Sequence, residues 1–103
     1  MAAKQTHLWT WSGSYFGMRE GDDLWTYKGK HAGRFKGDDV FAADGRYLGE
    51  MNGTRLVTKV QNKGLRGTPF TPLAPRGTLR ALAGYTANSM YPGFEEFPKP
   101  ELL

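Results

Sequence analysis

The hydrophobic pattern between residue 8 and residue 61 repeats every 16 residues. Each repeat begins with a short apolar run, and the four runs start at Leu8, Leu24, Val40 and Leu56. Aromatic and branched side chains dominate these runs, and such residues favour strands because they fit a pleated, half-buried surface. A second segment with alternating polarity follows each of the first three runs, at 14–19, 30–35 and 46–51. The pattern therefore predicts about seven antiparallel strands, joined as hairpins by short turns.

Glycine follows the same period. Nine of the fourteen glycines fall into three registers: Gly13, Gly29 and Gly45; Gly17, Gly33 and Gly49; Gly21, Gly37 and Gly53. The first and third registers have turn chemistry. The second lies within strands, where glycine costs about 0.5–1 kcal/mol relative to alanine, so its repetition predicts a bulge or a close approach near a common axis. We expect structural turn or axis roles for Gly13, Gly17, Gly29, Gly33, Gly45 and Gly49.

Period-two alternation sorts the side chains onto two faces. One face carries the rows Trp9, Trp25 and Phe41; Tyr15, His31 and Tyr47; and Arg19, Phe35 and Met51. The other carries Leu8, Leu24, Val40 and Leu56, with Phe16, Ala32 and Leu48. Because both faces are partly apolar, the sheet must close or wrap on itself. We favour a core position for the Trp9 row, but the sequence leaves open which face is inside.

These observations predict an all-β fold: an antiparallel meander of 16-residue β-hairpin pseudo-repeats in a compact flower-like or barrel-like arrangement. Residues 1–64 form the repeat domain, and residues 65–103 form a Pro-rich and aromatic C-terminal arm. The fourth repeat has Gln61, Leu65 and Pro69 where the period predicts glycine. The sequence therefore leaves open whether the fold closes within one chain.

Two of the repeats, at 24–35 and 40–51, and the ending at 90–98 support a family resemblance. They read LWTYKGKHAGRF, VFAADGRYLGEM and MYPGFEEFP. This pattern resembles the four-fold β-flower proteins, a family of small bacterial proteins. The resemblance implies four β-petals around a pseudo-four-fold axis, and it implies no particular activity.

The arm has its own pattern. Pro69, Pro72 and Pro75 recur every third residue, which places them on one edge of a polyproline II helix. With Arg66 they read Arg-x-x-Pro-x-x-Pro, a type of segment that can dock into aromatic grooves. The interpretation that we favour is an extended arm packed on the protein's own Trp and Tyr face. A short helix is predicted at 79–85, a turn at 91–94, and apolar anchors at Phe94 and Phe97.

Charge is unevenly distributed in this chain of 103 residues with net charge +4. Residues 1–53 hold seven basic and seven acidic side chains, whereas residues 54–80 hold no acidic side chain. Basic residues in that second segment are candidate contacts for a polyanion: Arg55, Lys59, Lys63, Arg66, Arg76 and Arg80. The chain has no cysteine, no recognisable export signal and no apolar run of membrane-spanning length, so we expect a cytoplasmic protein without a membrane partner.

No motif for catalysis is present, and we predict no catalytic, cofactor-binding or metal-binding residue. The two histidines, His7 and His31, do not have metal-ligand spacing, and His31 replaces the tyrosines of the other repeats. The pairs at 22–23 and 38–39 are aspartates that follow turn glycines, where side-chain to backbone bonds explain them. We therefore expect a non-enzymatic binding or assembly module, acting through protein contacts or self-association. The alternative is polyanion or nucleic-acid binding through residues 54–80.

Overall fold

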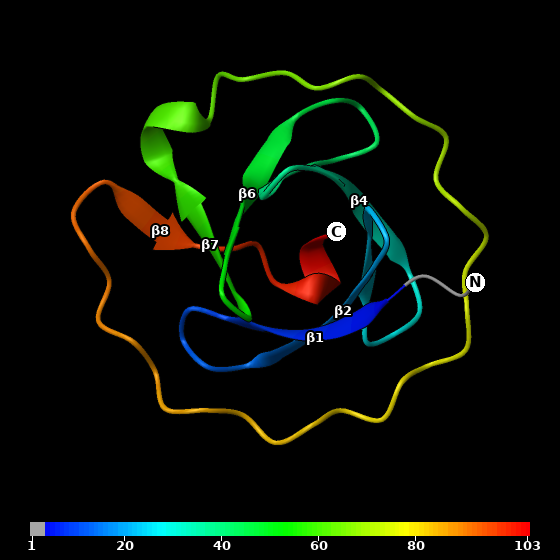
Figure 1. Ribbon diagram of the computed structural model, residues 1–103, viewed down its shortest axis with the longest axis horizontal. Coiled ribbons are helices and arrows are strands. Elements are labelled where there is room, and N and C mark those ends of the chain that lie inside the picture. Colours follow the sequence, from blue (N-terminus) through cyan, green and yellow to red (C-terminus); the bar gives the residue numbers. More distant parts are fainter. Residues whose placement is uncertain (1–3) are drawn as a thin grey trace.

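The protein is a closed β-barrel of seven strands with one extra strand, and the computed structural model describes residues 4–103 (Figure 1). Consecutive strands pair in chain order, and each pair is antiparallel. The elements are β1 (Gln5–Thr10), β2 (Tyr15–Glu20), β3 (Asp23–Thr26), β4 (His31–Lys36), β5 (Asp39–Phe41), β6 (Tyr47–Asn52), β7 (Arg55–Lys59), η1 (Val60–Asn62), β8 (Phe94–Glu96) and η2 (Pro100–Leu102). The predicted all-β succession of hairpins is confirmed.

The barrel closes through a parallel pairing of β1 with β7, so the sheet is mixed and not purely antiparallel as predicted. Trp9 N–H donates to the Thr54 carbonyl at 2.8 Å, and Trp11 N–H donates to the Leu56 carbonyl at 3.0 Å. In a meander, the first and the seventh strand run in the same direction. A ring of seven must therefore close through a parallel pair, and here it does so within one chain.

The two ends of the barrel carry different turns. At one end the loops have two residues, and Gly21 in the first of them has a φ of 61°, as expected for glycine at the first position of a tight hairpin turn. At the other end Thr10 N–H donates to the Ser14 carbonyl at 2.8 Å, and Gly13 N–H to the Thr10 carbonyl at 2.9 Å. Three residues lie between Thr10 and Ser14, so this loop is one residue longer than the predicted two-residue turn.

Each of the first three hairpins contains a β-bulge beside its mid-strand glycine. In the first hairpin Leu8 pairs with Gly17 and Trp9 pairs with Tyr15, which leaves Phe16 as the extra residue. The same shift recurs between β3 and β4 and between β5 and β6. A bulge was one of the two explanations that the sequence analysis offered for glycine in the middle of these strands.

The bulge resets the alternation of side chains, and this corrects the predicted face of one row. Phe35 was placed on the same face as Trp25, but it belongs to the barrel core. The Arg19 guanidinium lies 4.1 Å from the centre of the Phe35 ring, and Met51 packs against the same core. Strict period-two alternation fails here because the bulge adds one residue to the strand.

The barrel interior is formed by the face that carries the leucine row. Its buried side chains are Leu8, Phe16, Leu24, Ala32, Phe35, Val40, Leu48, Leu56 and Phe97. The row of Trp9, Trp25 and Phe41 is also buried, but on the outside of the barrel wall. Both apolar faces are therefore covered, the inner one by the barrel itself and the outer one by another part of the chain.

The mid-strand glycines lie against the backbone of the neighbouring hairpin. A Cβ atom at Gly33 would lie 2.7 Å from the Phe41 carbonyl oxygen, and one at Gly49 would lie 2.6 Å from the Val57 carbonyl oxygen. Gly17 has the same relation to Trp25, at 2.0 Å. The strands approach too closely for a side chain at these points.

The last segment of the chain supplies the missing half of the fourth hairpin. β8 pairs with β7, and Val57 lies opposite Glu96. Val57 holds the repeat position of Trp9, whose partner is Tyr15, so the residue after Glu96 corresponds to Phe16. That residue is Phe97, which is 1% exposed and packs edge to face on Phe16 with ring centres 5.3 Å apart. Residues 65–103 thus contribute to the same core as the repeats.

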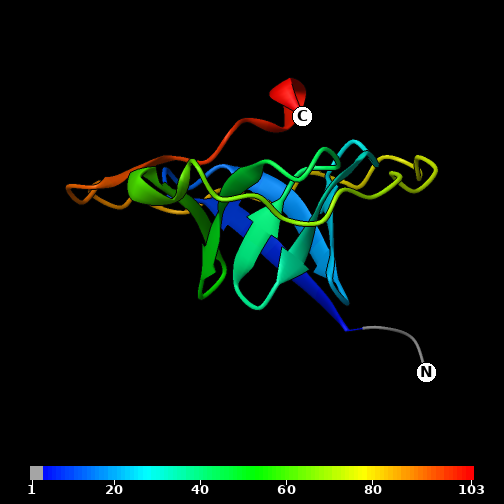
Figure 2. The same cartoon turned by 90° about the horizontal axis from the view of Figure 1, so that it is seen from above.

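Residues 65–93, which we call the belt, run in an extended path around the barrel (Figure 1). In side view the belt lies towards the end of the barrel on which η2 sits (Figure 2). The helix predicted at 79–85 is not formed, because Leu79 and Tyr85 donate their N–H groups to barrel carbonyls instead. The turn predicted at 91–94 is present, with Phe94 N–H donating to the Tyr91 carbonyl at 3.1 Å.

Candidate functional site

The belt is fastened to the barrel at three equivalent stations. Belt N–H groups donate to the carbonyls of the loop glycines: Gly67 to Gly45 at 2.7 Å, Arg76 to Gly29 at 2.8 Å, and Tyr85 to Gly13 at 2.9 Å. Three further bonds follow the same spacing: Phe70 to Ala43 at 2.9 Å, Leu79 to Tyr27 at 2.6 Å, and Asn88 to Trp11 at 3.0 Å. Nine residues of belt therefore span each 16-residue repeat of the barrel.

The loop glycines leave room for the belt to cross them. A Cβ atom at Gly13 would lie 2.0 Å from the Tyr85 carbonyl oxygen, and one at Gly29 would lie 2.0 Å from the Arg76 carbonyl oxygen. At Gly45 the corresponding distance to the Gly67 oxygen is 2.5 Å. These glycines thus serve two purposes, because they form the turn and also admit the belt.

The aromatic face of the barrel is covered by the belt. The Trp9 and Tyr85 rings lie 4.5 Å apart, and the Arg76 guanidinium lies 4.0 Å from the centre of the Trp25 ring. The Trp9 indole N–H also donates to the Ala83 carbonyl at 3.0 Å, as the Trp11 indole does to Ser89. The favoured interpretation, that the arm packs on the protein's own Trp and Tyr face, is confirmed. Because the belt covers these aromatic rows, they are not open to a ligand.

His31 is a structural contact of the belt. Leu73 N–H donates to its Nδ1 at 2.9 Å, and its Nε2 lies 3.0 Å from a carboxylate oxygen of Asp23. An Nδ1 that accepts cannot carry a proton, so the proton lies on Nε2 and is donated to Asp23. Phe70 also packs beside His31. The centre of its ring lies 5.2 Å from the centre of the His31 ring and 4.5 Å from the Arg34 guanidinium.

Half of the predicted polyanion residues hold the belt or its ends in place. Arg55 donates to the carbonyls of Thr10, Trp11 and Thr86 and stacks on Tyr85. Arg76 pairs with Glu20 at 2.7 Å, and Lys63 pairs with Glu95. Of the other three, Arg66 and Arg80 are exposed on the belt, and Lys59 is half-buried. The six lie in β7, directly after η1 and along the belt, which runs around the barrel.

The ion pair between Arg76 and Glu20 ties the second station to the end of β2. Hydrogen bonds from Arg76 and Gln5 lower the pKa of the Glu20 carboxyl to about 2, and the same bond raises the pKa of Arg76. Both charges therefore persist over the whole neutral range.

Several large apolar side chains of the belt remain exposed, although the Tyr85 and Tyr91 rings also pack on Trp9 and Trp11. Three of them, Leu73, Leu82 and Tyr91, are spaced by nine residues and are 43%, 38% and 59% exposed. The spacing equals that of the fastening stations, so each projects near a different hairpin. Further exposed members are Leu65, Tyr85 and Met90. This row was not predicted from the sequence, because the nine-residue period appears only when the belt is matched to the barrel.

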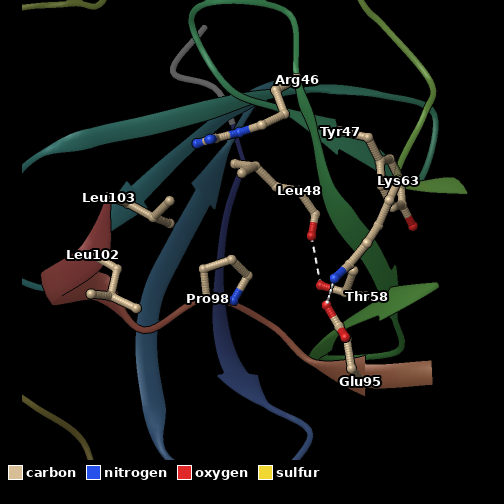
Figure 3. Close-up of a pocket in the computed structure, with 9 residues that line it drawn as sticks. All are labelled: Arg46, Tyr47, Leu48, Thr58, Lys63, Glu95, Pro98, Leu102 and Leu103. Carbon is tan, nitrogen blue, oxygen red and sulfur yellow. Dashed lines mark hydrogen bonds and ion pairs between the residues drawn. The ribbon is translucent and has the colours of Figure 1, made fainter. Parts of the chain in front are cut away.

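A cavity of about 380 Å³ lies between η2 and the wall formed by β6 and β7 (Figure 3). Among the residues that line it, Lys63 and Glu95 neutralise each other, and the Thr58 hydroxyl donates to the Leu48 carbonyl at 2.6 Å. Neither cysteine nor histidine lines this cavity. The Thr58 hydroxyl and the Lys63–Glu95 pair are therefore engaged within the protein, whereas Arg46, which also lines the cavity, forms no ion pair within residues 4–103.

The belt, rather than this cavity, is the candidate functional surface. Over residues 4–103, no group of three His, Asp or Glu side chains lies close enough to hold a metal ion. The same part of the chain contains no helix that is long and apolar enough to cross a membrane. Comparison of the chain with protein-family models, with curated protein sequences and with solved structures finds no match.

Proposed function

We propose that the protein is a non-enzymatic binding and assembly module that makes its contacts through the exposed apolar side chains of the belt. The observation that carries this proposal is the row of Leu73, Leu82 and Tyr91, which are exposed although they are large and apolar. Single exposed apolar residues are ordinary; the support here is that six of the eight large apolar residues exposed within residues 4–103 lie on this one segment.

The fastening of the belt supports the same proposal. Six backbone bonds and the stacked rings beneath the belt hold it in one path around the barrel. A partner that binds an already ordered segment does not have to order it, which lowers the entropy cost of association. The barrel then acts as a rigid frame that presents the belt.

Self-association is the form of this function that can be tested without a known partner. Molar mass is measured by light scattering after size exclusion, over a range of protein concentrations and at low and high salt. We expect a mass above one chain at high concentration, which persists in salt because the contact is apolar. Leu82→Ser should weaken it, whereas Leu102→Ser, on the exposed η2, serves as the control. One chain per particle at every concentration would contradict self-association.

Polyanion binding is the second candidate function. It is supported by Arg66 and Arg80, which are exposed on the belt and form no ion pair within residues 4–103. Binding of a short single-stranded DNA should then weaken linearly in log affinity as log salt rises. The variant with Arg66→Glu and Arg80→Glu should abolish binding, and equal binding by this variant would exclude the candidate.

We propose further that the barrel derives from four hairpins, as the likeness to the four-fold β-flower proteins implies. The support is the position of β8 and Phe97, which occupy the place that the second strand of a fourth hairpin would take. A single polypeptide with four sequential hairpins and no belt should therefore fold to the same barrel core, as judged by far-UV circular dichroism and melting temperature.

A further inference from the structure

The first half of the belt contacts the barrel with every third residue. The N–H groups that donate to the barrel belong to Gly67, Phe70, Leu73, Arg76 and Leu79. A contact every third residue is the signature of a polyproline II helix, which has three residues per turn and therefore three edges. The residues of one edge donate their N–H groups to the barrel, and the residues of the other two, which we call the free edges, are exposed.

The two free edges carry the proline motif. One edge consists of Arg66, Pro69, Pro72, Pro75 and Thr78, and the other of Thr68, Thr71, Ala74 and Gly77. All nine residues are exposed. Packing of the arm on the barrel and display of the Arg-x-x-Pro-x-x-Pro motif are therefore compatible, because they use different edges of the same helix.

The free edges bring together pairs of the kind that an aromatic groove accepts. Neighbouring residues across the two edges form the dipeptides Thr68-Pro69, Thr71-Pro72 and Ala74-Pro75. Successive dipeptides of this kind fill successive pockets between aromatic side chains, while the third residue of each turn points away from the groove. Here those third residues, Phe70 and Leu73, donate their backbone N–H groups to the barrel.

We propose that residues 66–75 are a docking site for a partner domain that has an aromatic-lined groove for x-Pro dipeptides and a carboxylate beside it for Arg66. This inference rests on the proposed function and names its surface and the class of its partner. The Arg66 side chain is exposed, and its one hydrogen bond within residues 4–103 is to the neighbouring Leu65 carbonyl at 3.4 Å. It is therefore available for a charged contact that fixes the orientation of the partner.

Two features favour this occupant over a partner that adds a β-strand. Proline has no N–H group, so Pro69, Pro72 and Pro75 cannot donate to an added strand. The segment is also already extended and fastened at both sides of the motif, by Gly67 and by Arg76. A groove that reads a preformed polyproline II helix gains from this order, because little conformational entropy remains to be lost.

The test uses the full-length protein and three isolated domains with different grooves of this class: an SH3 domain that binds Arg-x-x-Pro-x-x-Pro peptides, a WW domain and an EVH1 domain. Isothermal titration calorimetry is run with each, after a control titration with a proline-rich peptide that the domain is known to bind. We expect saturable binding of the SH3 domain. Arg66→Ala and Pro72→Ala should each weaken it at least tenfold, and Arg80→Ala, another exposed belt arginine, should change it less than twofold.

Near-UV circular dichroism of each variant shows whether the belt stays on the barrel, because it reports the packing of the aromatic rings between them. The inference is overturned if none of the three domains binds while all bind their control peptides. It is equally overturned if binding is unchanged by both Arg66→Ala and Pro72→Ala. A protein that self-associates but binds no domain refutes this inference and leaves the proposed function standing; a monomer that binds the SH3 domain through Arg66 and Pro72 supports the inference and refutes self-association.

Discussion

Replacing Phe97 with alanine tests whether the end of the chain is part of the barrel core. Phe97 is 1% exposed, it packs edge to face on Phe16 at 5.3 Å, and its ring is close to the space that a side chain at Gly49 would need. Removal of a phenyl ring from such a site loses its transfer free energy and leaves a cavity in a closed barrel that cannot collapse freely. The expected loss is about 3–5 kcal/mol.

That loss is a large part of the total stability of a domain of this size, which is on the order of 5–15 kcal/mol. Each kcal/mol lowers the melting temperature of a small domain by roughly 4–8 °C, so Phe97→Ala should melt at least about 12 °C below the wild type. Urea unfolding followed by tryptophan fluorescence measures the change in free energy, because the indoles of Trp9, Trp11 and Trp25 lie under the belt.

Leu102→Ala is the matched control, since Leu102 lies five residues further on and is 75% exposed. It should change the free energy of unfolding by less than about 0.5 kcal/mol. If Phe97→Ala is also within about 0.5 kcal/mol of the wild type, Phe97 does not complete the core, and the account of the fourth hairpin is refuted.

Two further predictions concern the barrel wall and the belt. Gly33→Val should lose at least about 3 kcal/mol or fail to fold, because its Cβ would collide with the Phe41 carbonyl oxygen; Gly64→Val, in open space, is the control, and equal stability of the two variants by urea unfolding would refute the collision. The Glu20 carboxyl has its pKa lowered from 4.5 to about 2 in the folded protein, so its ion pair with Arg76 stabilises above pH 4.5, and this contribution is lost as the pH falls to 2. The difference in urea midpoint between wild type and Glu20→Gln should therefore shrink over that pH range, and a difference that is independent of pH would speak against this pairing.

The barrel was largely predictable from local signals. Half-buried strands show alternating apolar and polar residues, and tight turns often contain glycine. Because both signals recur every 16 residues, the hairpins can be read from the sequence. The inner face was harder to assign, because a bulge of one residue moves Phe35 from one face to the other, and the mid-strand glycine suggests a bulge without showing which residue is the extra one. Closure of the sheet was expected, but its completion within one chain by a parallel pair was not, since that depends on how many strands complete the ring.

The belt could be predicted only in part, for a physical reason. Its proline spacing indicated an extended segment with three residues per turn, and its aromatic residues indicated that the segment packs on the barrel. The fastening stations at Gly67, Arg76 and Tyr85 share no residue type, because the bonds come from backbone N–H groups that every non-proline residue has. The basic residues predicted to contact a polyanion lie partly on the belt. Because the belt circles the barrel, such neighbours in sequence are spread around it.

The belt also explains how one segment can stabilise the fold and remain available for binding. Its Tyr85 and Arg76 side chains cover Trp9 and Trp25, whereas Pro69, Pro72 and Leu82 are exposed. Substitutions of these exposed residues should consequently alter association without altering stability. Proline at a station position, which removes the N–H group that donates to the barrel, should instead lower stability.

The central claim is that the belt is fastened around its own barrel at regular stations. Amide hydrogen exchange measured by NMR tests it most directly, because it reports each N–H group separately. The amides of Gly67, Arg76 and Tyr85 donate to barrel carbonyls and should exchange slowly, whereas those of Thr68 and Thr71 face away and should exchange quickly. Uniformly fast exchange along the belt would contradict the claim, because it would show a segment that is not held against the barrel.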